Sequence, residues 1–485
     1  MSEAVTRSAV TSSTGPGLLA SLDPHLRGWL PRQRWFAGKG RPVTGFSLVS
    51  ATELLPLGSR LGLLHLLVRA HQPPPAGAPS PSTSPGDCYQ LLLGVRELLP
   101  PRLAHALIGH VQEGPLAGRT VYEALHDARL TTVLLEAIRG QVQLGEVRFE
   151  REAQDDTPWK PETSEELAPR LATAEQSNSS VVYGDTFILK LLRRVLPGVN
   201  PDLELPLALA REDCARVPAP VGWLRATPEE SDAENDAESY LLGVLQPYLR
   251  GAVDGWELAL RSLAKGEDFG REARALGRAT AEVHTALTRA LPTVTLGHAQ
   301  LRPLVDGMTA RLATTAQAVP ALRPYEGALR SAFEALAQLA TEGHTWVAQR
   351  VHGDLHLGQC LRIPDGDWSL IDFEGEPVKP LAERRLPHPV ARDIAGMLRS
   401  FDYAAHAAPP PGRPPAPGWA TACRAAYCTG YAEVAGYDPR TDPVLLRAYE
   451  TDKAVYEVLY EARHRPDWLP VPMTAIRRLS AEAAR

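Results

Sequence analysis

Residues 349–359 read QRVHGDLHLGQ, and residues 371–374 read IDFE. These two segments place carboxylates and an amide in the order that phosphoryl transfer requires. In kinase sites an aspartate orients the acceptor hydroxyl, an amide five residues later binds a metal ion, and a second aspartate beyond a short strand binds the same ion. These positions fall on Asp354, Gln359 and Asp372. Because Mg²⁺ prefers oxygen ligands, we expect Asp354 to be the catalytic residue and Gln359 and Asp372 to bind Mg²⁺.

His352, Asp354 and His356 alternate, and such a triplet also occurs in metallohydrolases whose imidazoles bind zinc. No further cluster of His, Asp or Cys follows in the sequence to complete a zinc site. We therefore expect both histidines to support the loop and to contact the substrate. Arg392 and Asp393, at an expected helix start, are candidates to brace this loop from behind.

An upstream hairpin carries a lysine. Residues 175–190 read EQSNSSVVYGDTFILK, which predicts a strand, a tight turn at residues 184–185 and a second strand ending in Lys190. A lysine on a buried strand needs anionic partners, and in kinases these are nucleotide phosphates and a glutamate of the next helix. Glu204 is the candidate glutamate, since residues 200–204 (NPDLE) predict a helix start. The alternative for Lys190 is a solvated strand end.

The turn before this hairpin is rich in serine and amide side chains. No GxGxxG motif covers the hairpin and no GxxxxGK[ST] motif occurs in the chain, so P-loop and Rossmann nucleotide binding are unsupported. Small side chains and free backbone N–H groups can approach phosphate oxygens, although such a cluster is usually only a loop. The residues expected to contact the nucleotide here are Gln176, Ser177, Asn178, Ser179 and Ser180. The expected hinge is residues 245–248 (LQPY), with Gln246 and Tyr248 beside adenine.

Taken together, the motifs resemble those of actinobacterial maltokinases, which belong to the aminoglycoside-phosphotransferase-like kinases. The resemblance is carried by residues 175–180, 187–190, 352–359, 371–377 and 455–463, while residues 29–41 (WLPRQRWFAGKGR) are similar to the start of that family's cap domain. The superfamily usually has asparagine where Gln359 stands, and glutamine resembles the maltokinase version. The resemblance implies transfer of the γ-phosphate of ATP to the anomeric hydroxyl of maltose, giving maltose 1-phosphate for α-glucan and glycogen synthesis. It also implies ATP and Mg²⁺ as cofactors.

The expected fold class is α+β: a protein-kinase-like bilobal fold with a β-rich N-lobe, a helical C-lobe and an additional N-terminal α/β cap domain. The 485 residues exceed the ~100–200 of one domain. We expect a cap over residues 1–140, a nucleotide-binding N-lobe over 141–250 and a C-lobe over 251–485. Cap strands are predicted at 43–53, 60–70 and 88–95, with a Pro/Ser-rich insertion at 72–86. N-lobe strands are predicted near 222 and at 240–246, with an acidic solvated turn at 229–238, and helical periodicity covers 256–291, 304–339, 390–403, 420–435 and 444–463, with a Pro-rich insertion at 409–417.

One C-terminal helix offers a candidate sugar site. Lys453, Tyr456, Glu457 and Tyr460 share an i, i+3, i+4, i+7 face, which can present hydrogen bonds and aromatic surface. The alternative is a packed aromatic stripe with flanking salt bridges. With the family resemblance, the expected substrate contacts are His356, Glu374, Lys453, Tyr456, Glu457, Tyr460, Glu461 and Arg463. In the cap motif, Trp35 and Lys39 suggest only a role in seating the cap on the N-lobe.

Charge and composition narrow the partners. A net charge of -6 and a pI near 6.2 argue against nucleic acid, because backbone binders carry basic surfaces. No apolar stretch approaches the ~20 residues of a membrane span, and the N-terminus lacks a signal-peptide core. We therefore expect a cytoplasmic monomer that acts on a small sugar. The five cysteines form no CxxC, so neither a zinc knuckle nor a disulfide framework is indicated.

Two rival functions stay open from the sequence. A kinase of another sugar, such as glucosamine, would use the same catalytic set, and the acidic Glu457 and Glu461 could meet an ammonium group. From another class, an inactive kinase fold could serve as a binding module, but that usually requires loss of the lysine or of a metal ligand. Protein kinase activity is disfavoured, because no HRD, DFG or APE triplet occurs in the expected places.

Overall fold

The computed structural model describes residues 15–73, 86–152, 167–172, 177–228, 238–377, 379–407 and 418–483. The chain forms two compact units: Met1–Asn200 with Pro220–Arg250, and Pro201–Ala219 with Gly251–Arg485. The division into three domains remains a prediction. Gln176, the insertion at 409–417 and most of the insertion at 72–86 and of the acidic turn at 229–238 lie outside the described residues.

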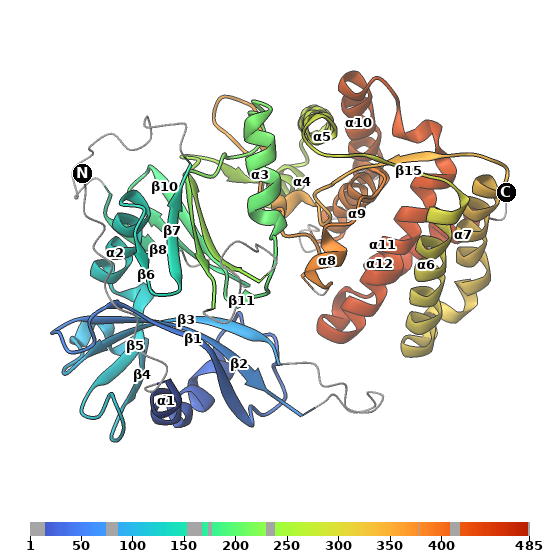
Figure 1. Cartoon of the computed structure of the whole chain (residues 1–485). Helices are drawn as coiled ribbons and strands as arrows, with labels where there is room; N and C mark the ends of the chain where they lie inside the picture. The colour runs from blue at the N-terminus through green and yellow to red at the C-terminus, as the bar shows by residue number, and fades with distance from the viewer. Residues whose placement is uncertain are drawn as a thin grey trace. The chain divides into compact units, whose positions relative to one another are not determined.

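The first sheet of unit 1 is antiparallel and has the strand order β1-β2-β3-β5-β4, with the short β11 paired to β3 (Figure 1). Its strands are β1 (Gly45–Leu55), β2 (Gly62–His71), β3 (Cys88–Arg96), β4 (Leu107–His110), β5 (Thr120–Glu123) and β11 (Arg194–Val195). The three strands predicted from the sequence are confirmed. Helix α1 (Gly15–Trp29) buries Leu22 and Leu26 in a common core with Leu66 and Val68 of β2. We name this sheet with α1 the cap sheet.

The second sheet of unit 1 has the order β6-β7-β12-β13-β10-β9-β8. Its strands are β6 (Gln143–Leu144), β7 (Val147–Arg151), β8 (Pro169–Leu171), β9 (Ser179–Tyr183), β10 (Phe187–Leu191), β12 (Gly222–Ala226) and β13 (Tyr240–Pro247), and α2 (Ala128–Arg139) packs on it (Figure 1). The predicted hairpin is confirmed as β9 and β10. Lys190 lies opposite Ser180 on one side and Val244 on the other.

Unit 2 is mainly helical (Figure 1). Its helices are α3 (Pro201–Arg211), α4 (Gly255–Lys265), α5 (Gly270–Ala290), α6 (His298–Ala318), α7 (Glu326–Thr341), α8 (Leu381–Arg384), α9 (Ala391–Ala407), α10 (Trp419–Ala435), α11 (Pro443–His464) and α12 (Pro470–Ala483). Its short strands are β14 (Val253–Asp254), β15 (Val294–Leu296), β16 (Trp346–Ala348), β17 (Cys360–Arg362) and β18 (Trp368–Leu370). Two cores fill the unit: α5 packs on α10, and α11 packs on α6, α7 and α9.

Helix boundaries differ from the predicted periodic segments in two places. Segment 256–291 is two helices, because Gly266 takes a left-handed conformation (φ 71°) that ends α4. Segment 304–339 is also two helices, separated by a 3-10 turn that begins at Pro320. The sequence analysis missed the helices α1, α2, α8 and α12. Among the described residues, none of the helices is long and apolar enough to cross a membrane.

Candidate functional site

The loop at 349–359 leads from β16 into the hairpin of β17 and β18. Asp354 precedes this hairpin and Asp372 follows it. The backbone N–H of Ile371 donates to the carbonyl of Gln359 (3.0 Å), which closes the hairpin. As a result, the Gln359 amide lies beside the Asp372 carboxylate, with Nε2 donating to Oδ2 at 2.8 Å. The structure therefore brings together the two residues predicted to bind a metal ion.

Asp393 of α9 holds the loop from behind, as expected. Its carboxylate accepts hydrogen bonds from the backbone N–H groups of His352 and Gly353, both at 2.8 Å, and contacts His284 Nε2 at 3.0 Å. Burial alone would raise the pKa of Asp393, but the contact with His284 and the bond from Gly353 outweigh it and lower the pKa to about 2. Gly353 has a φ of 86°, a conformation that side chains other than glycine rarely adopt. The loop conformation thus depends on Gly353 and on a buried anion.

Asp372 lies in an acidic group. Carboxylate oxygens of Asp202, Asp372 and Glu374 lie within 4.8 Å of one another. Asp372 also has a left-handed backbone (φ 67°), which is uncommon for a residue other than glycine. We expected Glu374 to contact the substrate; the structure places its carboxylate next to that of Asp372, one of the residues predicted to bind the metal ion. Oxygen donors of this kind suit a hard divalent cation such as Mg²⁺.

Asp354 forms an ion pair with Lys453 of α11, with Nζ 2.9 Å from Oδ1. Burial raises the pKa of Asp354, but the charges of Lys453 and His356 outweigh it and the net pKa is lowered. Burial lowers the pKa of Lys453, but the charges of Asp354 and Glu376 outweigh this effect, and the net pKa of Lys453 is raised. Asp354 is therefore a carboxylate and Lys453 an ammonium at neutral pH. The Lys453 ammonium also lies 5.3 Å from the centre of the Tyr456 ring.

Asp354, Lys453 and Tyr456 line one pocket of unit 2, which we call the Asp354 pocket. Its lining residues are Leu304, Met308, Arg311, Gly353, Asp354, Leu355, Glu376, Lys379, His388, Arg392, Gly396, Tyr449, Asp452, Lys453 and Tyr456. Three of the predicted site residues are among them: Asp354, Lys453 and Tyr456. His356 does not line the pocket; its Nδ1 accepts from the N–H of Gly358 (3.1 Å) and so caps the short turn before β17.

Further charged residues of this pocket form ion pairs; the sequence analysis named only Arg392 among them, and it pairs with Glu376 where a brace for the Asp354 loop was expected. Glu376 binds Lys379 (3.0 Å) and Arg392 (3.1 Å), and Arg311 of α6 binds Asp452 (2.8 Å). The signal available for Glu376 was its place in segment 371–377. Asp452 precedes Lys453 directly, whereas nothing in the sequence around Arg311 marks it.

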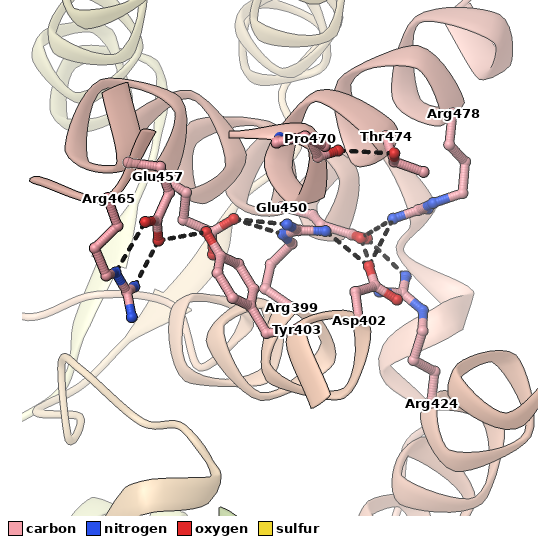
Figure 2. A network of polar contacts seen from close by, with 11 residues as sticks. Arg399, Asp402, Tyr403, Arg424, Glu450, Glu457, Arg465, Pro470, Thr474 and Arg478 are labelled. Atoms are coloured by element: carbon pink, nitrogen blue, oxygen red, sulfur yellow. Dashed lines mark hydrogen bonds and ion pairs between the residues drawn. The ribbon is translucent and has the colours of Figure 1, made fainter. Parts of the chain in front are cut away.

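Two acidic residues predicted to contact the substrate are in the protein interior instead. Figure 2 shows Arg399 of α9 between Glu457 and Asp402, with Arg399 Nη2 2.7 Å from Glu457 Oε2 and Nη1 2.7 Å from Asp402 Oδ2. Glu461 accepts from Arg465 (2.6 Å) and from the Tyr403 hydroxyl (3.1 Å). The predicted face of α11 therefore has two parts. Lys453 and Tyr456 line the pocket, whereas Glu457 and Glu461 bind arginines and Tyr403.

The remaining two residues of that set lie towards solvent. The Tyr460 ring stacks on Tyr456 (centroids 6.2 Å apart), and Tyr460 is 40% exposed. Arg463 is exposed. Neither of them lines the Asp354 pocket.

Replacing Glu457 with Gln should lower stability and leave substrate binding unchanged. Arg399 is 1% exposed, and removing the anion beside it leaves a buried cation with one partner fewer, a loss of about 3 kcal/mol in the free energy of unfolding. Chemical denaturation and sugar KM measure the two effects. Glu257→Gln, on the exposed side of α4, is the matched control. A raised sugar KM with unchanged stability would place Glu457 at the substrate after all.

The predicted nucleotide residues belong mostly to unit 1. Ser179 and Ser180 begin β9, Ser177 and Asn178 directly precede it, and Ser180 is buried. Gln246 lies in β13 opposite Ile188, and the N–H of Tyr248 donates to the carbonyl of Thr186 (2.8 Å). Strand β10, which carries Lys190, thus lies between β9, with its serines, and β13, with the expected hinge.

Glu204 has partners that the sequence did not predict. In unit 2 its carboxylate accepts from Arg350 (2.7 Å) and from Arg385 (2.9 Å), and these arginines lower its pKa against the effect of burial. Arg350 lies two residues before His352, so Glu204 joins α3 to the Asp354 loop. The predicted pair between Glu204 and Lys190, which belong to different units, stays a prediction.

Comparison with known proteins identifies the family. Residues 29–127 match the family model described as the maltokinase N-terminal cap domain. A glucosamine kinase of Streptacidiphilus jiangxiensis is 30% identical over 333 residues, 64% of this chain and 72% of that relative. The chain belongs to the family of sugar kinases that includes this glucosamine kinase. A glucosamine kinase of Mycolicibacterium smegmatis is 29% identical over 343 residues, 67% of this sugar kinase and 82% of the relative.

A solved structure confirms the fold of this sugar kinase. The glucosamine kinase in complex with glucosamine, ADP and inorganic phosphate aligns with a TM-score of 0.62 at 24% identity, over 92% of this chain and 96% of that chain. The predicted α+β, protein-kinase-like bilobal fold with an additional cap domain is confirmed. As a member of this family, the chain is a kinase, a phosphotransferase with an alcohol group as acceptor.

Proposed function

We propose that this sugar kinase transfers the γ-phosphate of ATP to the anomeric hydroxyl of maltose, giving maltose 1-phosphate for α-glucan synthesis. One observation carries the choice of a neutral sugar. Each carboxylate that lines the Asp354 pocket is already paired with a cation: Asp354 with Lys453, Glu376 with Lys379 and Arg392, and Asp452 with Arg311. Burial and the nearby cations lower the pKa of His388, the one histidine of the lining, to about 3, so it is neutral.

An ammonium substrate would therefore enter a pocket with an excess of positive charge. Four cationic side chains and three carboxylates line it, and like charges in a partly desolvated site repel. Hydroxyl groups meet no such penalty, because they can donate to paired carboxylates and accept from arginine and lysine. The match of residues 29–127 to the maltokinase cap domain is consistent with maltose.

Mechanistically, we propose that Asp354 orients the sugar hydroxyl and accepts its proton during in-line attack on the γ-phosphate. Lys453 keeps this carboxylate ionised and places positive charge beside the reacting oxygens. Lys190 neutralises nucleotide phosphates, and the residues at 177–180 contact them through N–H and hydroxyl groups. Tyr456 and Tyr460 offer aromatic surface to the sugar rings.

The proposal includes Mg²⁺, which would be held by Gln359 and Asp372 with Glu374 and Asp202 close by. When bound, Mg²⁺ supplies positive charge that neutralises the phosphates. The residues fit the ion because their donors are carboxylate and amide oxygens. We further propose that the enzyme is a cytoplasmic monomer.

A glucosamine kinase is the second candidate, since two relatives at 30% and 29% identity carry that name. The decisive experiment is ADP release with Mg²⁺-ATP across maltose, glucose, glucosamine and trehalose, followed by NMR of the product. We expect a kcat/KM for maltose at least about 100-fold above that for glucosamine, because an unpaired ammonium in this pocket costs several kcal/mol. Preference for glucosamine would overturn the substrate and keep the kinase mechanism.

A further inference from the structure

One buried arginine of unit 1 joins the cap sheet to the residues at 177–180, which we call the serine turn. Arg193 is 3% exposed and lies three residues after Lys190. Its Nε donates to Ser179 Oγ (2.8 Å), and its Nη2 donates to Glu123 Oε1 (3.1 Å). Its guanidinium lies 4.8 Å from the centre of the Trp35 ring. Trp35 and Glu123 both belong to the residues that match the cap domain.

The arginine determines where the Ser179 hydroxyl proton can point. Arginine has only donors, so Ser179 Oγ must be the acceptor of this bond. The serine proton is then directed away from the guanidinium towards a second acceptor. The guanidinium itself cannot swing, because it is planar, its Nη2 binds Glu123, and its face packs on Trp35.

The backbone beside Arg193 is also held by the cap sheet. Gln90 of β3 donates its backbone N–H to the Arg193 carbonyl (2.9 Å). Its side-chain Nε2 donates to the carbonyls of Leu192 (2.7 Å) and Leu242 (2.8 Å). The residue after Arg193 begins β11, which pairs with β3. Both the backbone and the side chain of Arg193 are therefore fixed by residues of the cap.

We propose that Arg193 is a positioning residue through which Trp35 and Glu123 of the cap orient Ser179, so that the Ser179 hydroxyl donates to a phosphate oxygen of the nucleotide. This inference rests on the proposed role of the serine turn in nucleotide binding. It gives the cap motif a chemical task that the sequence did not show. The cap then contributes to nucleotide affinity, while the sugar pocket lies in unit 2 and does not depend on this contact.

The test is Arg193→Lys in the full chain, with the Kd for Mg²⁺-ADP measured by calorimetry and the sugar KM measured in the assay. Lysine keeps the charge but cannot serve Ser179 and Glu123 together, so the ADP Kd should rise about tenfold while the sugar KM stays within about twofold. Arg69→Lys is the matched control: Arg69 of β2 donates to the Tyr240 hydroxyl of β13 (3.1 Å), another contact between the same two sheets. Its ADP Kd should stay near that of the wild type.

Further variants separate the possible failures. Ser179→Ala should raise the ADP Kd by a similar factor, and adding Arg193→Lys to it should change little more, because the two side chains act through one contact. If Ser179→Ala leaves the Kd unchanged, the proposed role of the serine turn fails. If Ser179→Ala weakens binding and Arg193→Lys does not, or lowers only the unfolding midpoint, the inference about Arg193 is overturned.

Should Arg193→Lys fail to fold, Trp35→Leu replaces it. This variant removes the ring that supports the guanidinium and leaves the charges of Arg193 and Glu123 paired. We expect a rise of about threefold in the ADP Kd. An unchanged Kd in a folded Trp35→Leu protein would contradict the inference.

Discussion

Replacing Asp354 with Asn is expected to lower kcat for the sugar about 1000-fold and to leave the Kd for Mg²⁺-ADP within about twofold of the wild type. Asparagine has nearly the same shape, so the loop held by Asp393 stays in place. It cannot accept a proton, and it removes the anion that lies 2.9 Å from the Lys453 ammonium. The unpaired Lys453 should also change sugar KM modestly. Steady-state kinetics and calorimetry measure the two quantities separately.

The matched control for Asp354→Asn is Asp306→Asn. Asp306 lies on α6 with a side chain that is 67% exposed and makes only a 3.8 Å ion pair with Arg302. Such surface changes are expected to be nearly neutral. If Asp354→Asn retains more than about a tenth of the wild-type kcat, general-base catalysis by Asp354 is wrong, because such catalysis contributes at least about 100-fold.

The sequence placed Gln359 beside Asp372 correctly, because the motif fixes these residue types at short, constant spacings. Asp354, Gln359 and Asp372 follow one another around a single β-hairpin, and the hairpin itself brings Gln359 to Asp372. Such local geometry depends only on neighbouring residues. For the same reason the lysine-bearing hairpin of β9 and β10 and the first three cap strands were predicted correctly.

The pocket was predicted less well, because its charges come from segments far apart in sequence. Arg311 on α6 meets Asp452 of α11, and Glu376 after the β-hairpin meets Arg392 of α9, only through tertiary packing. Spacing along α11 could not decide which of its polar residues face the pocket. A helical face of residues three and four apart is broad enough to contain both Lys453, which reaches Asp354, and Glu457, which binds Arg399 of α9.

Replacing Asp393 with Asn should both destabilise the protein and slow the reaction. An amide has one acceptor oxygen, whereas the Asp393 carboxylate accepts from two backbone N–H groups and contacts His284. At least one buried donor would lose its partner, so we expect a loss of about 3 kcal/mol in the free energy of unfolding at pH 7. A shift of the loop that carries Asp354 should lower kcat about 100-fold.

The stabilisation by Asp393 should depend on pH, because only the ionised carboxylate accepts all of these hydrogen bonds. The pKa of Asp393 is lowered from 3.8 to about 2 in the folded protein, so its ionised form contributes stability above about pH 4, and this contribution of about 2–3 kcal/mol is lost as the pH falls towards 2. The stability difference between wild type and Asp393→Asn should therefore shrink over that range. Glu450→Gln is the matched control, because the pKa of Glu450 is also lowered to about 2, in the arginine network of Figure 2. It should lose stability over a similar acidic range that begins slightly higher, because the ordinary pKa of glutamate is 4.5, and keep its kcat. An equal loss of kcat in both variants would mean that Asp393 affects the reaction only through general stability.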